Sequence, residues 1–222
     1  MTWTYALIHG AGDSGWYWHL VEAELRARGH HTVAPDLPAD DDAATLTDYA
    51  DVVIDALEDD DDVIVVGQSF GAFTAPLVAH RLQASGLVLV AAMVPRPGEP
   101  PADWWTNTGY AEAVREQAAA DGGLTGNQDE RVCYYHDVPD QLAARALGHD
   151  RAHPSTAAYE QPWPLERWPA VPTRVVLCTE DRLFPAAFLR RVARDRLGIT
   201  PDELASGHCP ALAHPQELAQ LL

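Results

Sequence analysis

The sequence predicts an α/β fold in which a mostly parallel six-stranded sheet carries helices on both faces. Short apolar runs alternate with segments of helical periodicity along most of the 222 residues. The runs are continuous in Val, Leu, Ile and Ala, as expected for strands that are buried on both faces. Repeated strand–helix–strand units indicate parallel strands joined by right-handed crossovers.

The apolar runs give the expected strands: Tyr5–His9, Thr32–Ala34, Val63–Gly67, Leu87–Ala92, Arg174–Cys178 and a weaker sixth strand within Ile199–Ala205. The expected helices are Trp16–Arg28, one that opens at Thr45, Ala186–Leu197 and Gln216–Leu222. Thr45 and Asp48 have the spacing of a capping box. Pro76 falls inside the helix expected after Val63–Gly67, so we expect a kink or a shifted helix start there.

One interval, residues 97–170, breaks this alternation. It has no clear strand, and it is rich in proline and tryptophan. A long structureless loop is uncommon inside a compact domain, so we expect a mostly helical cap inserted over the sheet. The core is then formed by residues 1–96 and 171–222.

The net charge of −18, with fifteen arginines and no lysine, argues against nucleic-acid and membrane partners. Three widely spaced cysteines without a C-x-x-C pair argue against a disulfide framework or a zinc site, so we expect no metal. They favour a reducing compartment, and with no visible signal peptide we expect a cytoplasmic protein. The sequence leaves open whether the chain forms a homodimer.

The motif Gly67-Gln68-Ser69-Phe70-Gly71 follows the most apolar strand and precedes a helical segment. This is the context of a nucleophile elbow, in which a serine occupies a strained turn and the flanking glycines let strand and helix approach closely. Ser69 is therefore the expected nucleophile. The segment His9–Gly12 follows the first strand and can present backbone N–H groups to an oxyanion. A plain glycine-rich turn is the alternative for this segment.

Ten histidines compete for the role of general base. Serine triads on this kind of sheet run in chain order Ser, acid, His, so only a late histidine fits. His208 stands between the last strand and the last helix. The acid should follow the preceding strand, where Asp181 is the first choice and Glu180 the alternative. All of these residues leave the carboxyl ends of parallel strands, the edge at which such sheets bind ligands.

Four segments together resemble the methylesterase and hydroxynitrile-lyase group of the α/β hydrolases: Ile8–Ala11, Gly67–Gly71, Cys178–Arg182 and Gly207–Pro215. The stretch Gly15-Trp16-x-Trp18 is also typical of that group. The resemblance covers nearly the whole chain and is weakest in the insertion. It implies the α/β-hydrolase fold, a triad of Ser69, His208 and Asp181, an oxyanion hole from the N–H groups of Ala11 and Phe70, and no cofactor.

The resemblance also bears on the choice between ester hydrolysis and cyanohydrin cleavage. Plant lyases of the group have threonine where this chain has Gly10, and lysine where it has Cys209. Both differences favour an esterase. Gly10 and Cys209, together with Trp104 and Trp105 of the insertion, are the expected substrate-binding residues.

The predicted function is hydrolysis of a small neutral carboxylic ester through an acyl-enzyme. No Arg or Lys lies in the elbow or the His9–Gly12 segment to hold a charged acid. The alternatives are a hydroxynitrile lyase or C–C hydrolase, and a non-catalytic small-molecule receptor. Which ester is cleaved depends on the insertion, where the sequence has the weakest structural signals.

Overall fold

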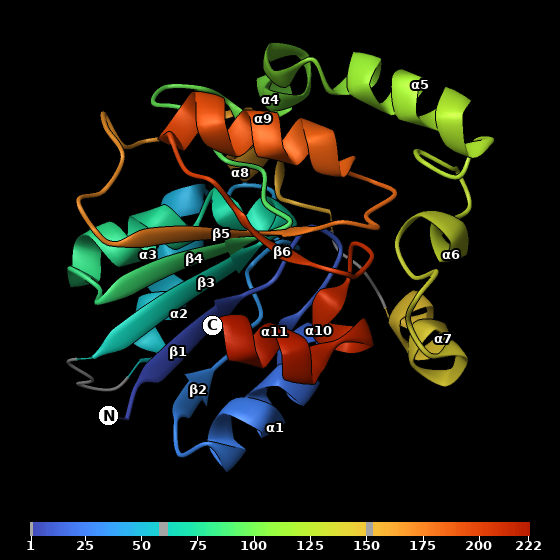
Figure 1. The fold of residues 1–222 in the computed structure, drawn as a ribbon. Coiled ribbons are helices and arrows are strands. Elements are labelled where there is room, and N and C mark those ends of the chain that lie inside the picture. The colour runs from blue at the N-terminus through green and yellow to red at the C-terminus, as the bar shows by residue number, and fades with distance from the viewer. Residues whose placement is uncertain (1, 58–61, 150–152) are drawn as a thin grey trace.

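A computed structural model describes residues 2–57, 62–149 and 153–222. Its centre is a six-stranded sheet in the order β2-β1-β3-β4-β5-β6 (Figure 1). The strands are β1 Thr4–Ile8, β2 His31–Val33, β3 Val63–Gln68, β4 Gly86–Val90, β5 Thr173–Cys178 and β6 Asp202–Leu204. Every neighbouring pair is parallel, so the prediction of a parallel sheet is confirmed.

The register of the central strands brings their carboxyl ends level with one another. Ile8 of β1 lies opposite Gly67 of β3, and Gln68 lies opposite Val90 of β4. The loops that follow β1 and β3 therefore leave the sheet side by side. This edge is where the sequence places its polar motifs.

Side chains that alternate along β1 enter two separate apolar cores, one on each face of the sheet. Ala6 and Ile8 contribute to one core, and Tyr5 and Leu7 to the other. The first core is covered by α2 Leu46–Asp55, α3 Ala75–Leu82 and α9 Ala186–Leu197. The second is covered by η1 Gly15–Trp18, α1 His19–Ala27, α10 Pro210–Ala213 and α11 Pro215–Leu221 (Figure 1).

Local sequence signals account for several helix ends. Thr45 Oγ1 accepts a hydrogen bond from the Asp48 N–H (3.3 Å), and Asp48 accepts one from the Thr45 N–H (2.7 Å), so the predicted capping box is present. After β3 the chain forms a short 3₁₀ turn, η2 Ser69–Ala72, and α3 begins only at Ala75. Pro76 thus lies in the first turn of α3, where its missing N–H costs no hydrogen bond.

The chain between β4 and β5 holds the helices α4 Pro101–Thr108, α5 Tyr110–Asp121, α6 Glu130–Cys133, α7 Asp140–Gly148 and α8 Thr156–Glu160. In Figure 1 helices α5, α6 and α7 follow one another along the outer side of the molecule. Indole N–H groups fix both ends of this segment to the core: Trp104 donates to the Val94 carbonyl (2.9 Å) and Trp163 to the Phe73 carbonyl (2.8 Å). Within the described ranges, no helix combines the length and apolar character needed to cross a membrane.

Candidate active site

Ser69 occupies a sharp turn at the end of β3, where its backbone φ of 50° lies in the left-handed region. Neighbouring glycines make this turn feasible. A Cβ on Gly71 would lie 2.6 Å from the His9 carbonyl oxygen, and one on Gly67 would lie 2.6 Å from Ala75 Cβ. Such distances are too short for any side chain at either position. The turn therefore brings β1, β3 and α3 together and projects Ser69 from the edge of the sheet.

A continuous hydrogen-bonded chain joins Ser69, His208 and Asp181. His208 Nε2 lies 3.2 Å from Ser69 Oγ, and His208 Nδ1 lies 2.8 Å from Asp181 Oδ2. Asp181 follows β5, and His208 lies between β6 and α10. With Nδ1 donating to Asp181, the lone pair of Nε2 faces the serine hydroxyl. This tautomer allows His208 to act as a general base.

The turn after β5 explains why Asp181, and not Glu180, faces His208. Its second carboxylate oxygen, Oδ1, accepts hydrogen bonds from the backbone N–H groups of Leu183 (2.8 Å) and Phe184 (2.9 Å). The Glu180 backbone instead bonds to the loop after β6, through its N–H to the Ser206 carbonyl (3.0 Å). Asp181 is thus held on both oxygens while its side chain is fully buried.

Other groups pack closely around the imidazole of His208. The Phe184 ring meets it edge to face at 5.2 Å, and the Tyr134 ring does so at 5.6 Å. The Gln68 amide donates to the His208 carbonyl (3.2 Å). The Gln68 side-chain nitrogen also lies 3.4 Å from His208 Nε2, so this ring nitrogen faces both Gln68 and Ser69.

Two backbone N–H groups of residues that line the cavity are candidates for stabilising a developing negative charge. In the described part of the chain, neither the Ala11 N–H nor the Phe70 N–H donates a hydrogen bond. Ala11 lies in the loop after β1, and Phe70 directly follows Ser69. Their free donors match the pattern of an oxyanion hole.

His9, two residues before Ala11, holds this loop in place. Its Nδ1 lies 2.8 Å from the Gly10 carbonyl, and its Nε2 accepts a hydrogen bond from the Leu37 N–H (3.2 Å). Burial lowers the pKa of His9. Nε2 accepts a hydrogen bond and burial favours the neutral ring, so His9 serves to hold the structure of the loop.

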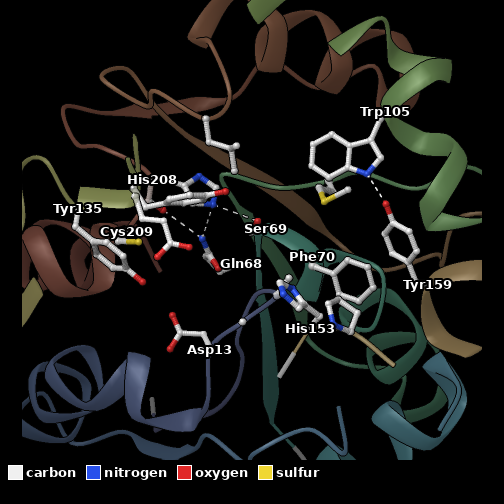
Figure 2. Close-up of a pocket in the computed structure, with 17 residues that line it drawn as sticks. Asp13, Gln68, Ser69, Phe70, Trp105, Tyr135, His153, Tyr159, His208 and Cys209 are labelled. Atoms are coloured by element: carbon white, nitrogen blue, oxygen red, sulfur yellow. Dashed lines mark hydrogen bonds between the residues drawn. The ribbon is translucent and has the colours of Figure 1, made fainter. Parts of the chain in front are cut away.

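A cavity of about 670 Å³ opens above Ser69. In Figure 2 the aromatic side chains Trp105, Tyr159 and Phe70 lie on one side of Ser69, and Tyr135 and Cys209 lie on the other. Trp105 Nε1 donates to the Tyr159 hydroxyl (3.0 Å), which fixes both rings. The site therefore combines the hydrogen-bonded Ser69 and His208 with a wall to which five aromatic residues contribute.

Comparison with known proteins agrees with this geometry. The sequence matches the alpha/beta hydrolase family over residues 6–221. The chain belongs to this family. Among curated relatives, Methylesterase 7 of Arabidopsis thaliana is 28% identical, and the alignment covers 98% of this chain and 94% of the relative.

Solved structures show the same fold. Polyneuridine aldehyde esterase superposes with a TM-score of 0.79 at 20% identity, over 100% of this chain and 98% of the other. A pyrethroid hydrolase from Sphingobium faniae JZ-2 superposes with a TM-score of 0.78 at 22% identity, over 100% of this chain and 96% of the other. The predicted fold class and enzyme class, an α/β-hydrolase esterase, are confirmed.

The structure of this α/β hydrolase places two of the four expected substrate-binding residues, Trp105 and Cys209, in the cavity wall. It differs from the prediction at the other two. Trp104 is fully buried, where its ring packs against Phe184 and Phe188. Gly10 is not among the described residues that line the cavity, and a Cβ there would lie 2.4 Å from Gln68 Oε1.

The hydrolase also has cavity residues that the sequence did not reveal. They come mainly from the insertion and the loop after β1: Gly12, Asp13, Glu130, Tyr134, Tyr135, His153, Pro154 and Tyr159, with Gln68, Met93 and Leu183 from the core. Gln68 was within reach of sequence reasoning, since it directly precedes the nucleophile. Within the described residues, no group of three or more His, Cys, Asp or Glu side chains is arranged to hold a metal ion.

Proposed function

We propose that this α/β hydrolase cleaves small neutral carboxylic esters through an acyl-enzyme formed on Ser69. The observation that carries the proposal is the chain of contacts from Ser69 Oγ through His208 to the buried Asp181. Its relatives named methylesterase and esterase support the reaction class. The chemistry is acyl transfer to a serine followed by hydrolysis.

In the first step His208 Nε2 removes the proton from Ser69 Oγ as the oxygen attacks the ester carbonyl carbon. The carbonyl oxygen becomes an oxyanion, which the N–H groups of Ala11 and Phe70 stabilise. The tetrahedral intermediate then expels the alcohol, which takes the proton from His208. Asp181 stays ionised throughout and stabilises the imidazolium.

In the second step a water molecule attacks the acyl-enzyme. His208 again accepts the proton, and a second tetrahedral intermediate collapses to release the carboxylic acid and restore Ser69. The same two N–H groups hold the oxyanion in both steps. Removing one donor of this kind typically costs about 3–4 kcal/mol of transition-state stabilisation.

The cavity wall disfavours an anionic substrate and offers aromatic side chains to an apolar one. Among the described residues that line it, none is an arginine. Arg131 of α6, an arginine of the insertion, instead pairs with Asp140 (2.6 Å) outside the cavity. Burial raises the pKa of the Tyr134 phenol to about 12, so that hydroxyl stays neutral near pH 7. The acidic side chains of Asp13 and Glu130 also line the cavity, so a carboxylate-bearing substrate would meet two acidic groups there and no arginine.

We also propose a cytoplasmic location. Cys133, Cys178 and Cys209 are buried free thiols, the state that a reducing compartment maintains.

The test is labelling with a fluorophosphonate together with turnover of an aryl acetate. We expect one labelled residue, Ser69, and no labelling or turnover in Ser69→Ala. Ser85→Ala, which changes an exposed serine before β4, is the matched control and should keep both. Labelling that persists in folded Ser69→Ala would overturn the proposal.

A further inference from the structure

A short segment of the insertion, Cys133–Asp137, contacts both loops that carry the partners of Ser69. On the loop after β5, His136 Nε2 lies 3.0 Å from the Glu180 carbonyl, and Cys133 Sγ lies 3.5 Å from the Arg182 carbonyl. Both contacts flank Asp181. The position of the acid is therefore coupled to the insertion as well as to the sheet.

Asp137 makes the equivalent contacts on the loop that carries His208. One carboxylate oxygen, Oδ2, accepts hydrogen bonds from the Gly207 N–H (2.6 Å) and the Ser206 hydroxyl (3.1 Å). It also lies 3.5 Å from His214 Nε2. Hydrogen bonds to a charged acceptor are stronger than those between neutral groups, so this oxygen holds the backbone beside His208 firmly.

The fit around Gly207 shows how tightly the two segments are packed. A Cβ on Gly207 would lie 2.5 Å from Asp137 Oδ1 and 2.7 Å from His136 Nε2. Ser206 is completely buried beneath this contact. In the described part of the molecule Asp137 Oδ1 is buried without a hydrogen-bond partner, so Oδ2 carries the carboxylate's whole link to the loop.

We propose that Asp137 is a positioning residue for catalysis, which acts through the Ser206–Gly207 backbone to hold His208 Nε2 toward Ser69. The proposal rests on the acyl-transfer function proposed above. Asp137 touches neither Ser69 nor the cavity. Its effect is on the distance and angle between His208 and the serine hydroxyl, to which proton transfer is sensitive.

The experiment compares Asp137→Ala with Asp137→Asn, measuring kcat and KM per active site titrated with fluorophosphonate. Alanine removes both hydrogen bonds to the loop. We expect kcat to fall by about 10- to 100-fold while KM changes less than threefold, since the cavity wall is unchanged. Asparagine can place its amide oxygen at the Oδ2 position and its NH₂ where Oδ1 has no partner. Asp137→Asn should therefore keep kcat within about threefold of the native value.

Two further variants keep the test decisive. Ser206→Ala removes one of the two hydrogen bonds and should lower kcat several-fold even if Asp137→Ala fails to fold. Asp140→Ala is the matched control, because Asp140 also lies in the insertion but its carboxylate is 93% exposed. It should leave kcat unchanged.

Titration separates the possible outcomes. A role in folding alone would lower the fraction of titratable sites and leave kcat per site at the native value, and this result would overturn the proposal. So would a fall in kcat of equal size for alanine and asparagine. If the native enzyme is not labelled at Ser69, the proposed function fails instead, and the two failures are distinguishable.

Discussion

The two oxygens of Asp181 have different partners, and this division sets the state of His208. Oδ1 is held by the backbone of the turn, and Oδ2 faces His208 Nδ1. The first pair of bonds fixes the carboxylate, which then fixes the imidazole. In the proposed mechanism the carboxylate orients the imidazole and stabilises its positive charge.

We expect Asp181→Asn to fold normally and to lower kcat by up to about 10⁴-fold, because the amide can donate to Nδ1 and so favour the wrong tautomer. The measurement is steady-state hydrolysis of an aryl ester with a circular dichroism spectrum as the folding check. Glu180→Gln is the control and should retain most activity. A larger loss in Glu180→Gln than in Asp181→Asn would show that the wrong carboxylate has been assigned.

Sequence reasoning reached Ser69 and His208 because each has a local signal: a glycine-flanked serine after a buried strand, and a histidine after the last strand. The sequence made Asp181 the first choice for the acid but left Glu180 as an alternative, since both follow β5. The turn of Leu183 and Phe184 decides between them. Trp104 and Trp105 show the same limit, because adjacent helix residues point in different directions and only packing selects the one that reaches the cavity.

At the scale of the elements, a buried ion pair between Glu99 and Arg196 joins the start of the insertion to helix α9. Arg196 Nη2 donates to Glu99 Oε1 (2.9 Å), and Arg196 Nη1 donates to Glu99 Oε2 and to the Val94 carbonyl. The two side chains are only 3% and 5% exposed. A pair buried to this degree is costly to break by removing one partner.

We expect Glu99→Gln to lower the free energy of unfolding by about 3–5 kcal/mol near pH 7, because Arg196 then stays buried without a counterion. Denaturant titration measures this change. Asp202→Asn, which breaks the half-exposed pair with Arg174, is the matched control, and should cost at most about 1 kcal/mol. Equal costs for the two substitutions would contradict this account of the insertion's anchor.

The ion pair of Glu99 and Arg196 should also make the free energy of unfolding depend on pH. Burial alone would raise the pKa of Glu99, but the hydrogen bonds from Arg196 and Asn107 outweigh it and hold the pKa below its usual value. The contribution of Glu99 is therefore complete above the unfolded pKa of about 4.3 and is lost as the pH falls through the lower folded pKa. The difference in unfolding free energy between the native enzyme and Glu99→Gln should shrink over that interval. A difference that is constant with pH would exclude a depressed pKa.

Element prediction succeeded where periodicity and caps coincide, as in α2 and α9, and was less complete in the insertion. None of the side chains of α5 is buried, so this helix has no apolar stripe to reveal it. The short helices α6 and α8 have only four and five residues. Their positions depend on contacts with the core, and sequence periodicity carries no information about those contacts.

For the molecule as a whole, the net charge of −18 should influence which substrates approach the site. Long-range repulsion lowers the association rate of anions, and salt screens it over about 8–10 Å near physiological ionic strength. A neutral aryl ester and its carboxylate-bearing analogue should therefore respond differently to salt. We expect kcat/KM for the anionic ester to be lower and to rise with salt, with little change for the neutral one.

Steady-state assays at low and high ionic strength measure kcat/KM for each of the two esters. The neutral ester is itself the control for effects of salt on the chemical step. Equal or better turnover of the anionic ester at low salt would mean that a cationic group reaches the cavity, and the proposed preference for neutral esters would be wrong.

The left-handed backbone of Ser69 has a consequence for protein engineering. Glycine adopts a φ of 50° without strain, whereas a residue with a side chain is destabilised there by roughly 1–2 kcal/mol. A search for more thermostable variants that scores only folding would therefore favour glycine at position 69. Under the proposed function such a search selects inactive enzymes, so it should hold this position fixed and look for added stability elsewhere.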